Sequence, residues 1–409
     1  MTSTHVHSEV CASQCAEDAA PALIPGPLAL YIHIPWCVRK CPYCDFNSHQ
    51  RPAELPVAEY VQALIRDLEF DLPSVWGRTV QSVFFGGGTP SLFPASAIND
   101  ILSACSARLR FAPGAEVTLE CNPGTAEFDR FEGYREAGVN RLSFGVQSFD
   151  DGCLKALGRI HDSGEAERAV KLAQDAGLHN LNIDLMYALP HQSMAMALHD
   201  VERALALNPA HVSHYHLTME PNTVFAARPP QGLPDEDSAW AMQEACQARL
   251  AEAGFSHYEI SAYAKPGKQC QHNLGYWNYA DYLGIGAGAH GKISFGHDGR
   301  IVRRWKKKNP REYLAAFQTG AAHGAHIGGD DDVLMPARPF DYMLNRLRLH
   351  APFSLHDFEQ STGVSRSAIA TEMTEAQAAG WLQGNGEVFA LTEQGRNFNN
   401  NLISLFLKD

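Results

Sequence analysis

The chain has 409 residues, of which 45% are hydrophobic and 19% charged, and its 46 acidic and 33 basic side chains give a net charge of −13. This composition is typical of a globular protein with one large domain and a smaller one, and it excludes disordered, collagen-like and disulfide-scaffold chains. The negative charge argues against general binding to nucleic acid or anionic membranes, and no apolar run is long enough to cross a bilayer.

Residues 1–27 precede the predicted fold. They are rich in proline and in small or polar residues and show no apolar periodicity, so we expect a mobile tail. The segment contains Glu9 and Glu17 and lacks a basic flank followed by an apolar run, so it does not resemble a secretory signal. We therefore predict a cytoplasmic protein whose ten cysteines are thiols or metal ligands rather than disulfides.

Strand-like runs alternate with helical patterns in the predicted core, residues 28–265. The runs cover residues 28–34, 82–85, 116–121, 141–146, 180–185 and 212–217. Gly138, Gly177 and Gly254 each follow a helical pattern, as the left-handed C-terminus of a helix requires. About six such units predict an α/β fold with a parallel sheet, either a partial barrel or a doubly wound sheet. The functional site is expected at the carboxyl ends of the strands.

The pattern changes after residue 265. Residues 266–334 form a segment rich in glycine and aromatic residues with a basic run at 303–308. We expect this run to be a solvated face, because five cations in an acidic protein are too few for a nucleic-acid stripe. Residues 335–409 combine helical patterns with a hairpin-like stretch at 381–392, which predicts a small, mostly helical, winged-helix-like domain.

Three of the ten cysteines are clustered. Cys37, Cys41 and Cys44 form a Cys-x3-Cys-x2-Cys loop directly after the first predicted strand. Three thiolates at this spacing can hold three irons of a [4Fe-4S] cluster and leave the fourth iron open to a substrate. The alternative is a structural zinc site with His33 or His49 as the fourth ligand. Zinc knuckles usually occur in pairs, and no second knuckle is present, so we favour the cluster.

This cysteine loop, with Tyr43 before its last cysteine, resembles the signature of the radical S-adenosylmethionine (SAM) superfamily. The Gly-Gly-Gly-Thr-Pro stretch at 86–90, one β/α unit later, resembles that superfamily's contact with SAM. The resemblance implies a partial (β/α)6 barrel in which SAM chelates the open iron. Tyr43 would lie against the adenine of SAM, and Gly87, Gly88 and Thr89 would lie at its methionine amino end.

Further stretches, at 30–49, 143–149, 182–187 and the 86–90 run, resemble a subgroup of that superfamily. It contains oxygen-independent coproporphyrinogen III oxidase and a related heme chaperone. The likeness implies that Tyr31 lies near SAM. It also implies that four other residues complete the pocket: Glu120, Gln147, Arg159 and Asp184.

Two functions compete within this subgroup. The oxidase would use a radical from SAM to decarboxylate porphyrin propionates, and its motif carries another cysteine where this chain has Phe46. Phe46 and the hexapeptide His-Asn-Leu-Gly-Tyr-Trp at 272–277 resemble the heme chaperone branch instead. We favour a carrier that binds heme and delivers it to respiratory apoproteins, with homodimer formation implied by the same resemblance. Whether the chain is also an enzyme stays open, and a radical SAM enzyme with another substrate is a third alternative.

His272 is the leading candidate for an axial ligand of heme iron. A neutral imidazole is a common ligand of heme, and Tyr276 and Trp277 are placed to flank a planar macrocycle. The alternative is a histidine that satisfies buried polar groups. Three other histidines are competing candidates: His214, His216 and His290.

Overall fold

The computed structural model describes residues 21–125 and 128–407. Residues 1–20 of the predicted mobile tail therefore lie outside the described residues. The chain divides into two compact units. Among the described residues, the larger unit comprises 27–125, 128–293 and 302–331, and the smaller one comprises 21–26, 294–301 and 332–407.

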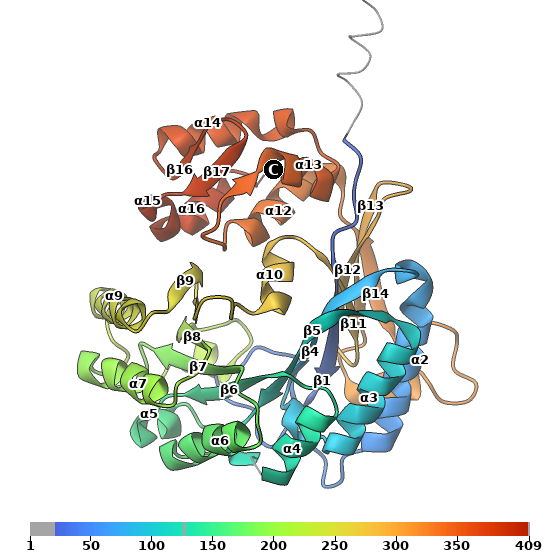
Figure 1. The fold of residues 1–409 in the computed structure, drawn as a ribbon, viewed down its shortest axis with the longest axis vertical. Coiled ribbons are helices and arrows are strands. Elements are labelled where there is room, and N and C mark those ends of the chain that lie inside the picture. The colour runs from blue at the N-terminus through green and yellow to red at the C-terminus, as the bar shows by residue number, and fades with distance from the viewer. Residues whose placement is uncertain (1–20, 126–127, 408–409) are drawn as a thin grey trace, which may run out of the picture. The chain divides into compact units, whose positions relative to one another are not determined.

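Six parallel strands form the centre of the sheet in the larger unit (Figure 1). In spatial order they are β1 (Leu28–Ile34), β4 (Thr79–Gly87), β5 (Arg110–Cys121), β6 (Arg141–Gln147), β7 (Leu181–Tyr187) and β8 (His211–His216). Each run predicted from the sequence overlaps one of these strands, so the predicted α/β fold with a parallel sheet is confirmed. Because the strands are parallel, all their carboxyl ends meet at one edge of the sheet.

Helices connect these strands. They are α2 (Val57–Val75), α3 (Ala95–Arg108), α4 (Phe128–Glu136), α5 (Asp151–Ala156), α6 (Ser163–Asp175) and α7 (Met194–Ala206), with α8 (Val224–Ala227) and α9 (Glu236–Glu252) after β8. Gly138, Gly177 and Gly254, just beyond α4, α6 and α9, have φ values of 105°, 86° and 83°, which confirms the predicted left-handed helix ends.

Additional strands widen the sheet on both sides. Beside β1 lie β11 (Asp281–Ile285), β12 (His290–Phe295), β13 (Arg300–Lys306) and β14 (Ile327–Asp332), and beside β8 lie β10 (Ala262–Ala264) and β9 (Ser256–Glu259). The predicted segment 266–334 is therefore largely part of the main sheet. It also contains α10 (Gln271–Trp277) and α11 (Pro310–Ala315).

Two residues of the basic run, Arg304 and Lys306, form ion pairs within the fold. The expectation of a solvated face was wrong for these two residues. Lys306 is buried, with its ammonium 2.6 Å from Asp67 and 2.5 Å from Asp71 of α2. Arg304 pairs with Asp71 at 2.6 Å and with Asp330 at 2.9 Å. These charges join β13 to α2 instead of facing solvent.

The smaller unit contains α12 (Arg338–Arg346), α13 (Leu355–Thr362), α14 (Ala370–Ala378), α15 (Glu393–Asn397) and α16 (Asn399–Ser404). A three-stranded antiparallel sheet accompanies them, in the order β15 (Phe353–Ser354), β17 (Val388–Leu391), β16 (Leu382–Gly384). The predicted mostly helical domain with a hairpin is confirmed. No helix in the described part of the chain is both long and apolar enough to cross a membrane.

Candidate functional site

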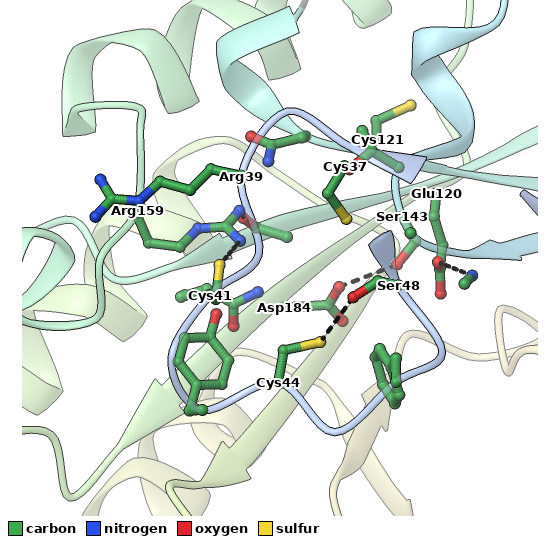
Figure 2. A pocket seen from close by; sticks show the side chains of 18 residues that line it. Cys37, Arg39, Cys41, Cys44, Ser48, Glu120, Cys121, Ser143, Arg159 and Asp184 are labelled. Atoms are coloured by element: carbon green, nitrogen blue, oxygen red, sulfur yellow. Dashed lines mark hydrogen bonds between the residues drawn. The ribbon is translucent and has the colours of Figure 1, made fainter. Parts of the chain in front are cut away.

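A cavity of about 160 Å³ lies where the loop after β1 meets the carboxyl ends of β4, β5, β6 and β7 (Figure 2). Almost all residues predicted for the cluster and for SAM line it. They are Cys37, Cys41, Tyr43, Cys44, Gly87, Gly88, Thr89, Glu120, Gln147, Arg159 and Asp184. Two predicted residues, Tyr31 and His272, do not line this cavity.

The cysteine loop is held at both ends. Trp36 and Cys37 form β2, which pairs with β3 (His49–Gln50) and so closes the loop on itself. The indole of Trp36 is buried against the rings of Tyr60 and Phe93. Figure 2 shows the three cysteine side chains of the loop directed into the cavity. The backbone therefore presents three thiols to one space.

The part of the loop that follows Cys44 is hydrogen-bonded to residues just beyond β11 and β13. The amide of Asn47 donates hydrogen bonds to the carbonyls of Ala287 and Lys308, each at 3.0 Å. Its own carbonyl accepts a hydrogen bond from His33, at 2.9 Å. A Cβ on Gly288 would lie 2.0 Å from the Asn47 amide nitrogen, so only glycine permits this close approach. The loop is thus fixed against the connection between β11 and β12.

The donors in the cavity fit an iron–sulfur cluster that is open at one iron. Three thiols are available, and the Arg159 guanidinium donates a hydrogen bond to Cys41 Sγ at 3.5 Å. No three His, Cys, Asp or Glu side chains in residues 21–125 and 128–407 lie close enough to share one metal ion. The ring nitrogens of His33 are occupied by Tyr31 and Asn47. Nε2 of His49 is hydrogen-bonded to Lys308 O at 3.2 Å.

Two half-buried carboxyl groups, those of Glu120 and Asp184, face the same cavity. Burial and the nearby Asp184 raise the pKa of Glu120 to about 8, although the Gly87 N–H donates to Glu120 at 3.1 Å. Burial also raises the pKa of Asp184, which accepts hydrogen bonds from Asn182 and Ser143 at 2.7 and 3.2 Å. A cationic group in the cavity would stabilise both carboxylates.

The glycine run has a packing reason that the sequence did not show. A Cβ on Gly87, whose φ is 112°, would lie 2.4 Å from the His33 ring. A Cβ on Gly88 would lie 2.6 Å from the Trp36 carbonyl oxygen. The predicted reason was access of the backbone to a ligand. The structure adds that these glycines let β4 pack against β1 and the start of the cysteine loop.

Gln147, at the end of β6, has a φ of 73°, which is unusual for a residue with a side chain. Such strained conformations occur most often at functional sites. Some cavity residues were not predicted: Arg39, Phe46, Ser48, Cys121, Asn122, Ser143 and Gly145. The alternation of inward positions along β6 would have found Ser143 and Gly145, whereas the others depend on loop conformation.

His272 is in the interior. Its two ring nitrogens are hydrogen-bonded to Ser82 Oγ and to the Tyr276 hydroxyl, each at 3.0 Å, and its ring stacks on Phe84. Burial lowers its pKa to about 3, so it is neutral. Ligation of heme iron would require one of these two hydrogen bonds to break, and the role of His272 stays a prediction. His214 is also buried, whereas His216 and His290 are exposed.

Comparison with known proteins gives consistent matches. The family model of the radical SAM superfamily matches residues 31–204, and that of the HemN C-terminal domain matches residues 336–398. The heme chaperone HemW of Escherichia coli K12 is 49% identical over 94% of this chain and 99% of that protein. The heme chaperone HemW of Mycobacterium tuberculosis H37Rv is 34% identical over 92% of this chain and 96% of that protein.

A solved structure shares the fold. Coproporphyrinogen III oxidase HemN from Escherichia coli superposes with a TM-score of 0.78, over 97% of this chain and 93% of that chain. The identity is 22%, so this likeness establishes the fold and not the reaction.

Proposed function

The chain belongs to the HemW family of radical SAM proteins, and from this membership we propose that it is a heme chaperone. It binds heme and delivers it to respiratory apoproteins that require heme, while holding a [4Fe-4S] cluster and SAM. The observation that carries the proposal is 49% identity to the Escherichia coli heme chaperone over nearly the whole of both proteins. The cavity at the carboxyl ends of the strands supports the cofactor part.

Each cofactor has a matched set of residues. Cys37, Cys41 and Cys44 would hold the cluster, which supplies an open iron for the amino and carboxylate groups of SAM and an electron for its cleavage. The other residues that line the cavity would bind and orient SAM: Tyr43, Gly87, Gly88, Thr89, Glu120, Gln147, Arg159 and Asp184. Tyr31, which the resemblance places near SAM, does not line the cavity, so we assign it no direct contact. Glu120 and Asp184 suit the cationic end of this ligand, because their surroundings raise the pKa of both carboxyls and a nearby positive charge would stabilise the ionised forms.

Coproporphyrinogen III oxidase is the second candidate function. Its support is the shared fold. Against it stands Phe46, which occupies the position of a cysteine in the oxidase motif and lines the cavity with a ring that is 61% exposed. Phenylalanine supplies neither a thiol nor a proton, so any oxidase chemistry that needs that cysteine is missing.

Heme titration of the anaerobically reconstituted protein tests the proposal. A Soret band that saturates at a fixed number of hemes per chain is the expected result, and its absence would overturn the proposal. Incubation with coproporphyrinogen III, SAM and a reductant, followed by porphyrin analysis, separates the two candidates. We expect no protoporphyrinogen, and its formation over multiple turnovers would favour the oxidase.

Location and assembly belong to the same proposal. A cytoplasmic setting would keep the eight cysteines of the described chain as free thiols, as they are in the structure. A homodimer, which the family resemblance implies, would appear in light scattering as twice the 44.9 kDa chain mass.

A further inference from the structure

We propose that Asn182, His211 and Tyr258 are positioning residues that tie the first turn of α10 to the SAM cavity through one buried chain of hydrogen bonds. This inference rests on the proposed function, because it needs SAM in the cavity. It adds a way for that cofactor to act on another part of the larger unit, which contains the whole chain of bonds. Because α10 carries His272, the predicted heme ligand, this chain connects cofactor and cargo.

The chain of hydrogen bonds starts at Asp184, which lines the cavity. The Asn182 amide donates to the Asp184 carboxylate at 2.7 Å, and its oxygen lies 2.6 Å from Nδ1 of His211. Nε2 of the same ring lies 2.8 Å from the Tyr258 hydroxyl. The Tyr258 oxygen accepts a hydrogen bond from the backbone N–H of Cys270, at 3.3 Å. Cys270 directly precedes α10, so the chain runs from the cavity to the start of this helix.

All hydrogen bonds of this chain point the same way. The amide nitrogen of Asn182 donates to the carboxylate and to the Ser143 hydroxyl, so its oxygen is the acceptor for His211. Burial lowers the pKa of His211 well below its ordinary value, so the ring is neutral and carries one proton. That proton is on Nδ1, which leaves Nε2 to accept a hydrogen bond from Tyr258. Each donor is therefore directed toward Asp184.

The positioning residues are shielded from water. Asn182 and His211 are 2% and 1% exposed, and Tyr258 is 7% exposed. Hydrogen bonds in series polarise one another where the local dielectric is low. Burial raises the pKa of Asp184, and a positively charged ligand in the cavity would favour its ionised form. The ionised carboxylate attracts the donors more strongly, so the bond from Cys270 at the far end tightens as well.

The first turn of α10 depends on partners outside the helix. The first N–H groups of any helix lack partners within it, and the N-cap residue Cys270 makes no side-chain cap. The Cys270 N–H is bonded to Tyr258, and those of the next two residues donate to the Glu116 carboxylate, at 2.9 and 3.3 Å. The start of α10 is therefore held by Tyr258 and Glu116.

A buried arginine links these two holding points. Arg141 is 2% exposed, and its Nε lies 3.9 Å from the Glu116 carboxylate. Its positive charge also lowers the pKa of Asp184. One cation thus interacts with a carboxylate in the cavity and with the carboxylate at the start of α10, which gives the chain of hydrogen bonds an electrostatic counterpart.

Hydrogen–deuterium exchange with and without SAM tests this inference on the full-length, anaerobically reconstituted protein. In the wild type, SAM should slow exchange of the amides of residues 270–272 by about threefold or more, because the bonds that hold them tighten. Tyr258→Phe should remove this response, since phenylalanine keeps the ring but lacks the oxygen that joins His211 to Cys270. Calorimetry should show equal SAM affinity for both proteins within about twofold, and their iron content per chain should be equal.

Tyr263→Phe is the matched control. Tyr263, on the neighbouring strand β10, is also a buried tyrosine, but its hydroxyl is hydrogen-bonded to Gln247 and lies outside the chain of bonds. This variant should respond to SAM as the wild type does. His211→Leu breaks the chain at a second point and should also remove the response. His211→Gln should retain it, because an amide supplies one donor and one acceptor.

The possible failures are distinguishable. If the wild type binds SAM and exchange at residues 270–272 does not change, this inference is wrong and the heme chaperone proposal stands. The same conclusion follows if Tyr258→Phe and His211→Leu respond to SAM as fully as the wild type. If the wild type binds no SAM, this inference and the SAM part of the proposed function both fail.

Discussion

Glu120 shows at the scale of one residue how burial in the cavity makes ionisation of a carboxyl group unfavourable. Its pKa is about 8 in the folded protein, against an ordinary value of 4.5. Between these two values the folded state retains a proton that the unfolded chain has released, so this group's contribution to stability falls as the pH rises. A positively charged ligand in the cavity would stabilise the carboxylate that forms at higher pH.

We therefore predict that Glu120→Gln stabilises the protein purified without cluster or SAM. Its advantage over the wild type should grow by on the order of 2 kcal/mol between pH 6 and pH 8, since each unit of pH in this window changes the balance by about 1.4 kcal/mol. Urea unfolding at both pH values measures this. Glu244→Gln, at an exposed position of α9, is the control. An advantage that does not change with pH would contradict the assigned pKa.

The cysteines provide a second prediction at this scale. Replacing Cys37, Cys41 and Cys44 together by alanine should abolish the cluster's visible absorption and its iron, because each thiolate would ligate a different iron of the proposed cluster. Cys121→Ala is the matched control, since Cys121 lines the same cavity but donates its thiol to the Leu119 carbonyl. Four irons per chain in the triple variant would refute the assignment.

At the scale of the secondary-structure elements, local patterns predicted the six parallel strands and missed those beside β1. The six strands are apolar runs followed by amphipathic helices, a pattern that the sequence shows directly. β13 instead contains arginines and lysines, which suggest a surface. Lys306 can be buried there because Asp67 and Asp71, more than 230 residues away in the chain, neutralise it. The local periodicity of a sequence cannot predict an ion pair between residues so far apart in the chain.

This ionic contact predicts a large effect on stability. Lys306→Met should lower the free energy of unfolding by about 3–5 kcal/mol, because it removes the buried ammonium that both Asp67 and Asp71 contact, and Arg304 pairs with only one of the two carboxylates. Lys307→Met, at the next position and only half-buried, should change it by less than about 0.5 kcal/mol. Chemical denaturation monitored by circular dichroism measures both variants. Equal stability of the two would show that Lys306 does not support the contact between α2 and β13.

The sequence predicted the site residues that lie toward the carboxyl ends of the parallel strands. Glu120, Gln147 and Asp184 were placed by their position in β5, β6 and β7, and all three line the cavity. Tyr31 and His272 were expected from motif likeness. Neither lines the cavity: His272 is buried, Tyr31 is half-buried, and their ring centroids lie 6.4 Å apart. A motif identifies which residues matter, whereas the direction of each side chain depends on packing that the motif does not contain.

At the scale of the whole molecule, the chain forms two compact units, and a different family model matches each of them. The larger unit carries the cavity and the cysteine loop, and the radical SAM family model matches only within it. The smaller unit matches the HemN C-terminal domain and has a well-packed core, with Tyr342 and Phe358 in contact. Membership of the HemW family covers both units, so the proposed function is a property of the full chain.

Directed transfer of heme tests the central claim most directly. The full-length protein, reconstituted with its cluster and loaded with heme, is mixed with a heme-depleted respiratory cytochrome in the presence of excess apomyoglobin, which traps released heme. We predict that the cytochrome gains heme, seen in its own absorption bands and restored activity, faster than apomyoglobin collects it. Collection of all the heme by apomyoglobin, with the cytochrome left empty, would contradict the claim that this chain is a heme chaperone.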